Sequence, residues 1–149
     1  MAYDTLALMN RFRWSALCAV IVAPVALGLP AVASGTPGAG VEAEILAQAT
    51  RDGHDYITKE ITIAPGGGTG WHFHQGRVYG LIRSGTLTHF RADCSVDGVY
   101  PPGAPITEES GPVHNGRNLG PDPLVMWVVY IDQAGAPPAS DAADPGCGF

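Results

Sequence analysis

The protein has 149 residues and a formal net charge of −6, with 8 Lys and Arg against 14 Asp and Glu. A chain of this length accommodates one ordinary domain. The acidic balance and the lack of any basic cluster argue against nucleic acid or an anionic membrane surface as a partner.

The N-terminal segment has the pattern of an export signal. Arg11 and Arg13 precede an apolar run, WSALCAVIVAPVALGLP, which is followed by Ala31-Val32-Ala33. This order is typical of a secretory signal peptide with a small-x-small cleavage site. We predict a cleaved signal over residues 1–33, with Met9 as an alternative start, and a secreted or cell-envelope location. A single membrane anchor is the alternative, but the prolines in and after the run favour cleavage, after which we expect no membrane contact.

Two cysteines, Cys94 and Cys147, lie outside the predicted signal. In an exported protein, two remaining cysteines most simply form one disulfide. This bond would close a loop of about fifty residues and stabilise the fold by on the order of 3–4 kcal/mol. Two free thiols would need a reducing compartment, which conflicts with the predicted signal.

The rest of the chain has the pattern of short β-strands. Residues 41–50 are compatible with a helical turn or an edge strand, and the sequence does not decide between them. YITKEITIA, residues 56–64, alternates apolar and polar side chains as a half-buried strand does. Glycine and proline turns separate the later runs: WHFH, RVYGLI, TLTHF, PITE and LVMWVVYI. The last run is apolar on both faces, so we expect it to be buried on both.

These strands predict an all-β sandwich or barrel, because no segment between 51 and 133 shows a 3.6-residue apolar period. We divide the chain after the signal into an N-terminal lead-in over 34–54, a barrel over 55–132 and an irregular tail over 133–149.

The run GWHFH places His72 and His74 two residues apart. In a strand, both imidazoles would share one face while Trp71 and Phe73 pack on the other. If the sheet closes into a barrel, the histidine face can line its interior. Two imidazoles about 2.0–2.1 Å from an ion would make half of a metal site. The alternative is that the two histidines are polar strand residues without a metal.

Around these histidines the chain resembles the cupins. The first cupin motif sets a glycine, His-x-His, a glutamate and a second glycine at fixed spacings. Gly66, His72, His74 and Gly85 stand at those positions, and Val78 stands where the glutamate would be.

The second cupin motif resembles the later part of the chain. Gly103, Gly111, His114 and Asn118 stand at its glycine, glycine, histidine and asparagine positions, while Glu109 replaces a proline. The two motifs together are far more specific than one His-x-His pair.

The resemblance covers roughly residues 57–131 and implies one small antiparallel β-barrel of the jelly-roll, or double-stranded β-helix, type. It also implies one divalent metal ion per chain, held by His72, His74 and His114. Zinc, iron, manganese and copper are all candidates for that ion. A cupin barrel that keeps its histidines without a metal is the alternative.

The departure at Val78 leaves the expected metal site without its carboxylate. Glu108 or Glu109 could compensate, and the sequence leaves the choice open. His89 could be a fourth ligand, but we favour an ordinary strand histidine. Four residues are candidates to orient the ligands or to contact a substrate: Gln75, Tyr79, Glu109 and Asn118.

Two functions follow from the resemblance. The first is a metal-dependent enzyme acting on a small molecule, dioxygenase-like with iron, or isomerase- or hydrolase-like with zinc or manganese. The alternative is a non-enzymatic cupin that binds a small ligand with no metal or a non-catalytic one. Val78, Ile82 and Val129 are expected to line a rather apolar pocket. Dimers are common among cupins, but no edge strand here is distinctive enough to predict a homodimer.

Overall fold

The computed structural model describes residues 36–149, and the predicted signal peptide lies outside this part of the chain. Within residues 36–149 the regular structure is entirely β, so these residues contain no helix that could cross a membrane. The strands are β1 (Ala39–Arg51), β2 (His54–Gly68), β3 (His72–Phe73), β4 (Arg77–Ser84), β5 (Leu87–Arg91), β6 (Val96–Tyr100), β7 (Pro105–Glu108), β8 (His114–Asn118), β9 (Leu124–Gln133) and β10 (Ser140–Asp141).

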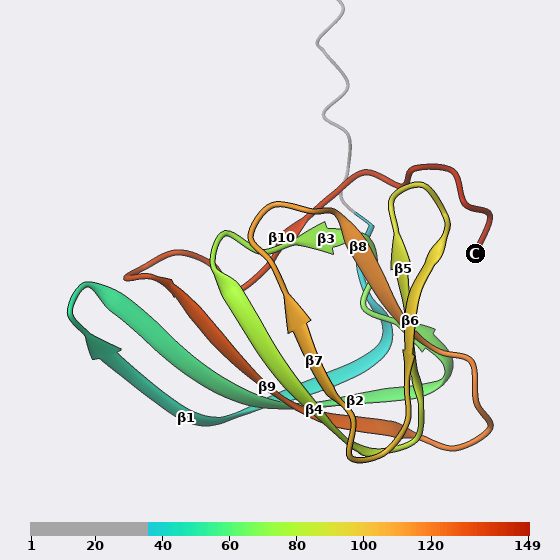
Figure 1. Ribbon diagram of the computed structural model, residues 1–149, viewed down its shortest axis with the longest axis horizontal. Coiled ribbons are helices and arrows are strands. Elements are labelled where there is room, and N and C mark those ends of the chain that lie inside the picture. The colour runs from blue at the N-terminus through green and yellow to red at the C-terminus, as the bar shows by residue number, and fades with distance from the viewer. Residues whose placement is uncertain (1–35) are drawn as a thin grey trace, which may run out of the picture. The chain divides into compact units, whose positions relative to one another are not determined.

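The strands form one antiparallel sheet that curls into a nearly closed barrel (Figure 1). The order of neighbours is β10-β3-β8-β2-β9-β4-β7, with β1 added beside β2 and with β5 joining β8 to β6. Strands β2, β9 and β4 make the longest continuous wall. The predicted all-β antiparallel barrel is therefore confirmed.

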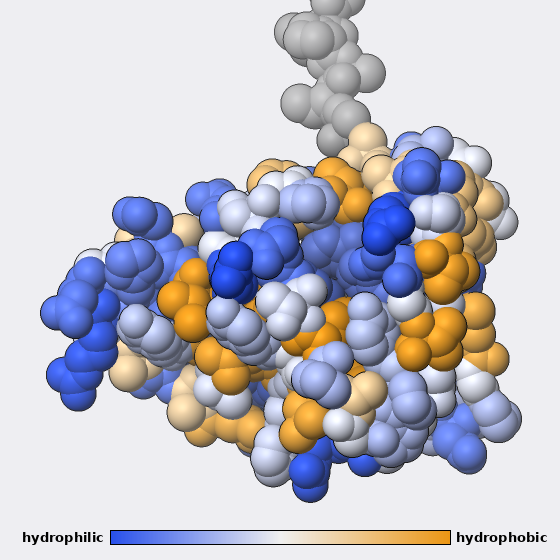
Figure 2. All heavy atoms as spheres, viewed as in Figure 1, coloured by the Kyte–Doolittle hydropathy of each residue, from blue (hydrophilic) through white to orange (hydrophobic). Residues whose placement is uncertain are grey.

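Alternation along each strand decides which side chains fill the barrel. The buried apolar cluster consists of Ile57, Ile61, Ile63, Val78, Ile82, Leu87, Ile106, Leu124, Met126, Val128 and Tyr130. The expectation that β9 is buried on both faces is wrong, because Trp127 on its outer face is 40% exposed. Val129 also lies on this outer face, so its predicted place inside the pocket is wrong. Figure 2 shows hydrophobic residues scattered among hydrophilic ones on one face of the molecule.

Residues 41–50, which the sequence left undecided, belong to the edge strand β1. The strand pairs with β2 from Ala39–Gly68 to Arg51–His54, so the segment described as a lead-in contains a long strand. Nearly all of β1 is exposed, and for this reason its sequence carries no clear apolar alternation.

The C-terminal tail is mostly irregular but reaches back to the histidine motif. Within it, β10 pairs with β3 so that Asp141 lies opposite His72. The predicted disulfide between Cys94 and Cys147 is present. Two residues after Cys147, Phe149 packs against Trp71, with ring centroids 6.1 Å apart. The tail therefore holds β3, which carries His72 and directly precedes His74.

Candidate metal centre

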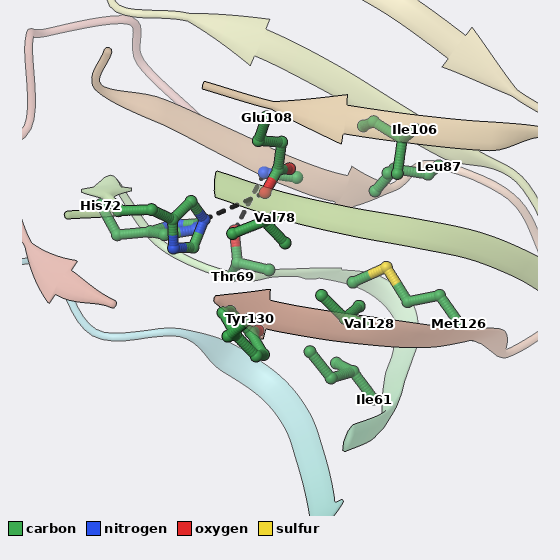
Figure 3. Close-up of a pocket in the computed structure, with 12 residues that line it drawn as sticks. Ile61, Thr69, His72, Val78, Leu87, Ile106, Glu108, Met126, Val128 and Tyr130 are labelled. Atoms are coloured by element: carbon green, nitrogen blue, oxygen red, sulfur yellow. Dashed lines mark hydrogen bonds and ion pairs between the residues drawn. The ribbon is translucent and has the colours of Figure 1, made fainter. Parts of the chain in front are cut away.

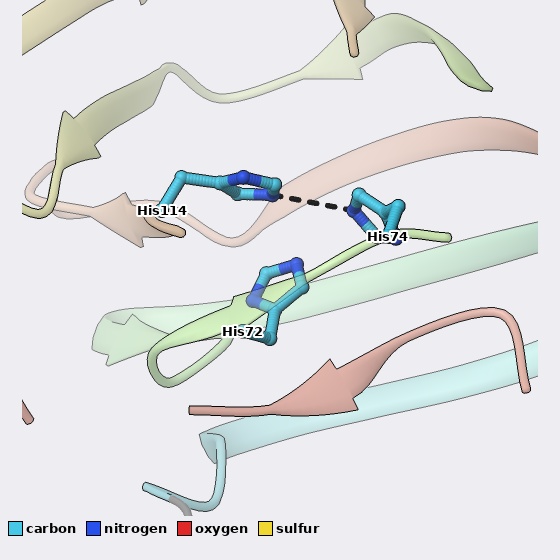
Figure 4. A group of neighbouring side chains, drawn as sticks. All are labelled: His72, His74 and His114. Atoms are coloured by element: carbon cyan, nitrogen blue, oxygen red, sulfur yellow. Dashed lines mark hydrogen bonds between the residues drawn. The ribbon is translucent and has the colours of Figure 1, made fainter. Parts of the chain in front are cut away.

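Three histidines meet inside the barrel. His72 on β3 is the register partner of His114 on β8, and their ring centroids lie 4.4 Å apart. His74 follows directly after β3, and its Nε2 lies 3.2 Å from Nε2 of His114 (Figure 4). One ring nitrogen from each histidine lies within 4.8 Å of the other two, and all three residues are buried. The structure therefore brings together the three predicted ligands.

Each of these rings is held by a backbone carbonyl at its Nδ1 atom. His72 Nδ1 lies 3.0 Å from Gly70 O, and His114 Nδ1 lies 3.0 Å from Pro112 O. His74 Nδ1 lies 2.7 Å from Pro138 O in the tail. A carbonyl only accepts hydrogen bonds, so each Nδ1 carries the proton and donates. Each Nε2 atom is then available to bind a cation.

The loop between β7 and β8 is also held against the first motif. Gly111 N–H donates to His74 O at 2.9 Å, and Ser110 Oγ donates to Gln75 O at 2.6 Å. Gly111 has φ of 102°, a backbone conformation that favours glycine. This accounts physically for a glycine at that motif position.

Glu108 is the acidic residue that reaches the histidines. It ends β7, and its Oε2 lies 3.0 Å from His74 Nε2 and 3.7 Å from His114 Nε2. Its side chain is only 16% exposed and points toward the histidines in Figure 3. Glu109, the other candidate, points outward and pairs with Arg77 at 2.6 Å. Of the two candidates, Glu108 is thus the one that lies beside the histidines.

His89 belongs to the same cluster, although the sequence favoured an ordinary strand histidine. Its side chain is buried on β5, with Nε2 3.4 Å from Glu108 Oε1 and Nδ1 3.1 Å from Asp97 Oδ2. His89, Glu108 and His114 form a second group whose ligand atoms lie within 4.8 Å of one another. The sequence contained a signal for the burial of His89. His89 lies two residues after Leu87 in the same strand, so the two side chains point to the same face, and Leu87 is buried in the core.

Burial and ion pairing set the protonation of the cluster. Burial lowers the pKa of His114 to about 4 and also lowers the pKa of His72. Burial acts in the same direction on His74, but the hydrogen bond to Glu108, the negative charges of Glu108 and Asp132 and the hydrogen bond to Pro138 O together outweigh it and raise that pKa. Burial alone would raise the pKa of Glu108, but the hydrogen bonds from His74 and His89 hold it well below its usual range. Near neutral pH, His72 and His114 are therefore neutral beside an ionised Glu108.

The remaining predicted site residues lie elsewhere. Gln75 and Tyr79 are exposed, and Tyr79 is on the outer face of β4. Asn118 is fully buried, but its side chain bonds to Ile63 O, Asp122 O and Gly120 N at the far end of β8. Instead, Tyr130, which the sequence did not single out, lines the cavity with its ring centroid 5.6 Å from that of His74.

Two hollows meet at Glu108. An inner cavity of about 30 Å³ is lined by His72, His74 and Tyr130 together with apolar residues of the core. An outer groove of about 480 Å³ is lined by polar residues that include His89, Asp97 and His114. The inner cavity is large enough for about two waters, whereas the groove is large enough for a small organic molecule.

No protein-family model matches this sequence, and no curated protein does. Solved structures do match. A cupin-2 domain from Rhodospirillum rubrum is 16% identical, with 72% of this chain and 69% of that chain covered and a TM-score of 0.59. A cupin-like protein from Thermotoga maritima is 19% identical, with 70% and 77% covered and a TM-score of 0.57. The polyketide cyclase RemF from Streptomyces resistomycificus is 18% identical, with 74% and 79% covered and a TM-score of 0.58.

These likenesses show the fold. The chain has the cupin fold, a double-stranded β-helix, as its two sequence motifs imply. It combines this fold with a cluster of buried histidines and one carboxylate that has the donor types of a divalent metal site.

Proposed function

We propose that the protein is an exported cupin-fold protein that binds one divalent metal ion through His72, His74 and His114 and acts on a small organic molecule. The observation that carries this proposal is the orientation of the three rings. All three donate from Nδ1 to backbone carbonyls, so Nε2 is the atom that each ring can offer to an ion, once His74 Nε2 gives up the proton that it donates to Glu108. Lone pairs 3.2 Å apart on His74 and His114 repel unless a proton or a cation lies between them.

The bound metal would supply Lewis acidity or, in the case of iron, oxygen chemistry. Neutral imidazoles suit zinc, copper and iron, so the ligand set alone does not choose among them. The residues of the chain hold the ion and shape the space around it. Tyr130 and the apolar wall keep the inner cavity small and limit the water beside the histidines.

A substrate would approach from the outer groove. The groove of about 480 Å³ shares Glu108 and His114 with the cluster, so a molecule bound there reaches the histidines. RemF is a polyketide cyclase, so the cupin fold supports catalysis on an organic molecule in at least one structural relative. We extend to this chain only the general class of small organic substrate.

A non-enzymatic ligand-binding function is the second candidate. It is favoured by the position of Tyr79, a candidate substrate contact that lies outside the barrel. The inner cavity also offers few polar side chains besides the cluster itself. A binding protein of this kind would hold its ligand in the groove whether or not the metal were present.

Metal content tests the proposal. We expect about one zinc, iron, manganese or copper ion per purified chain by plasma mass spectrometry, and a loss of this ion in His72→Ala and His114→Ala. His54→Ala is the matched control, because His54 bonds to Asp52 O outside the cluster and its removal should leave the metal in place. Protein that stays metal-free after incubation with all four ions would contradict the metal site and leave the ligand-binding function.

A further inference from the structure

Cross-strand register places Glu108 beside the position of the missing carboxylate. Val78, at the cupin glutamate position on β4, is the direct register partner of Glu108 on β7. Residues directly opposite each other in an antiparallel pair project from the same face, with Cβ atoms about 4.5–5.5 Å apart. Since Val78 points into the barrel and is 2% exposed, Glu108 points into the same space from one strand away.

We infer that Glu108 is the carboxylate ligand of the metal site, supplied by β7 in place of β4. This inference rests on the proposed three-histidine site and names its fourth protein ligand. Val78 is then the apolar neighbour that packs beside the carboxylate.

The distances between donor atoms support this assignment. Two atoms that bind one ion at about 2.1 Å lie about 3.0 Å apart in an octahedron and about 3.4 Å apart in a tetrahedron. Glu108 Oε2 is 3.0 Å from His74 Nε2 and 3.7 Å from His114 Nε2, and the two nitrogens are 3.2 Å apart. All three separations are close to those of atoms around a single ion.

The two oxygens of Glu108 have different surroundings. Oε2 lies beside His74 and His114, whereas Oε1 lies 3.4 Å from His89 Nε2. His89 is in turn held by Asp97, so the ring has little freedom to move away. His89 is therefore a positioning residue that keeps Oε2 turned toward the ion.

Charge also favours a carboxylate at this position. Three neutral imidazoles leave the full 2+ charge of the ion inside an apolar barrel, where an unpaired charge is costly. Glu108 lowers the net charge of the loaded site to 1+. Glu109 does not do so, because its side chain is 60% exposed and pairs with Arg77 on the surface.

The test compares matched variants of the full chain loaded with cobalt(II), whose visible absorption reports ligand number and type. Glu108→Gln should weaken cobalt binding at least tenfold in a chelator competition and change the spectrum. Glu109→Gln, the adjacent control, should leave both unchanged. The transposed variant Val78→Glu/Glu108→Gln should recover affinity and spectrum, because it returns the carboxylate to β4 opposite its present position. His89→Phe should alter the spectrum while leaving one ion per chain.

The outcomes separate this inference from the proposed function. Wild-type protein that binds no cobalt would overturn both. Cobalt that is lost in His114→Ala but bound by Glu108→Gln within twofold of wild type, with the same spectrum, would overturn only the role of Glu108. A second ion per chain that is lost in His89→Phe would also overturn the role of Glu108. In that case His89 would bind a metal of its own. If Glu108→Gln fails to give a native circular dichroism spectrum, Glu108→Ala replaces it in the same comparison.

Discussion

Replacing Asn118 separates a structural role from a role in the site. The cupin motif places this residue four positions after His114, but its side chain serves the backbone. Its Nδ2 donates to Ile63 O at 2.9 Å and to Asp122 O at 2.8 Å, and its Oδ1 accepts from Gly120 N at 3.0 Å. A net contribution of about 1 kcal/mol per hydrogen bond gives a loss of about 3 kcal/mol for Asn118→Ala. This is a large part of the stability of a small domain.

The assay is urea unfolding followed by tryptophan fluorescence, together with metal content of the folded fraction. Asn115→Ala is the matched control on the same strand, because the side-chain oxygen of Asn115 has no hydrogen-bond partner among the described residues. We expect a loss of about 3 kcal/mol for Asn118→Ala, a much smaller loss for the control, and unchanged metal affinity in both. Unchanged stability with lost metal or substrate binding in Asn118→Ala would refute this reasoning.

Two further predictions concern pH and the disulfide. His72 and His114 have pKa values lowered by burial, the latter to about 4, so the unfolded chain takes up their protons first as the pH falls. The unfolding free energy of chelator-treated protein should therefore fall by up to about 3 kcal/mol between pH 6.5 and pH 4 in denaturant titrations, with the raised pKa of His74 offsetting part of this loss. A flat profile over this range would contradict neutral buried imidazoles. Cys94→Ser/Cys147→Ser should lower the unfolding free energy by about 3–4 kcal/mol, and equal stability of the two forms would contradict a structural role for the bond.

Local pattern predicted the barrel and the three histidines because both depend on short-range features. The alternation of Ile57, Ile61 and Ile63 with polar residues marks a half-buried strand without knowledge of its partner. His72 and His74 needed only their spacing and the motif around them. The resemblance then supplied His114, which register pairing places opposite His72.

Glu108 and His89 could not be assigned in the same way, because their roles depend on which strands pair and in which register. Nothing local to PITE indicates that Glu108 lies opposite Val78. His89 enters the site because β5 pairs with β8, the strand that carries His114. These are long-range pairings that a single sequence does not specify.

Two of the predicted site residues could have been excluded by strand geometry. Tyr79 follows Val78, so a strand that turns Val78 inward turns Tyr79 outward. Asn118 shares the parity of His114, but four residues along a strand span about 13 Å, too far for contact with the same ion. Alternation and strand length together therefore limit what a motif alone suggests.

X-ray absorption spectroscopy at the edge of the bound metal is the most direct test of the site. We predict three imidazole nitrogens and one carboxylate oxygen at about 2.0–2.2 Å, with the imidazole signal reduced in His72→Ala. A bound metal whose spectrum shows no imidazole scattering, or is unchanged in that variant, would place the ion elsewhere and contradict the account.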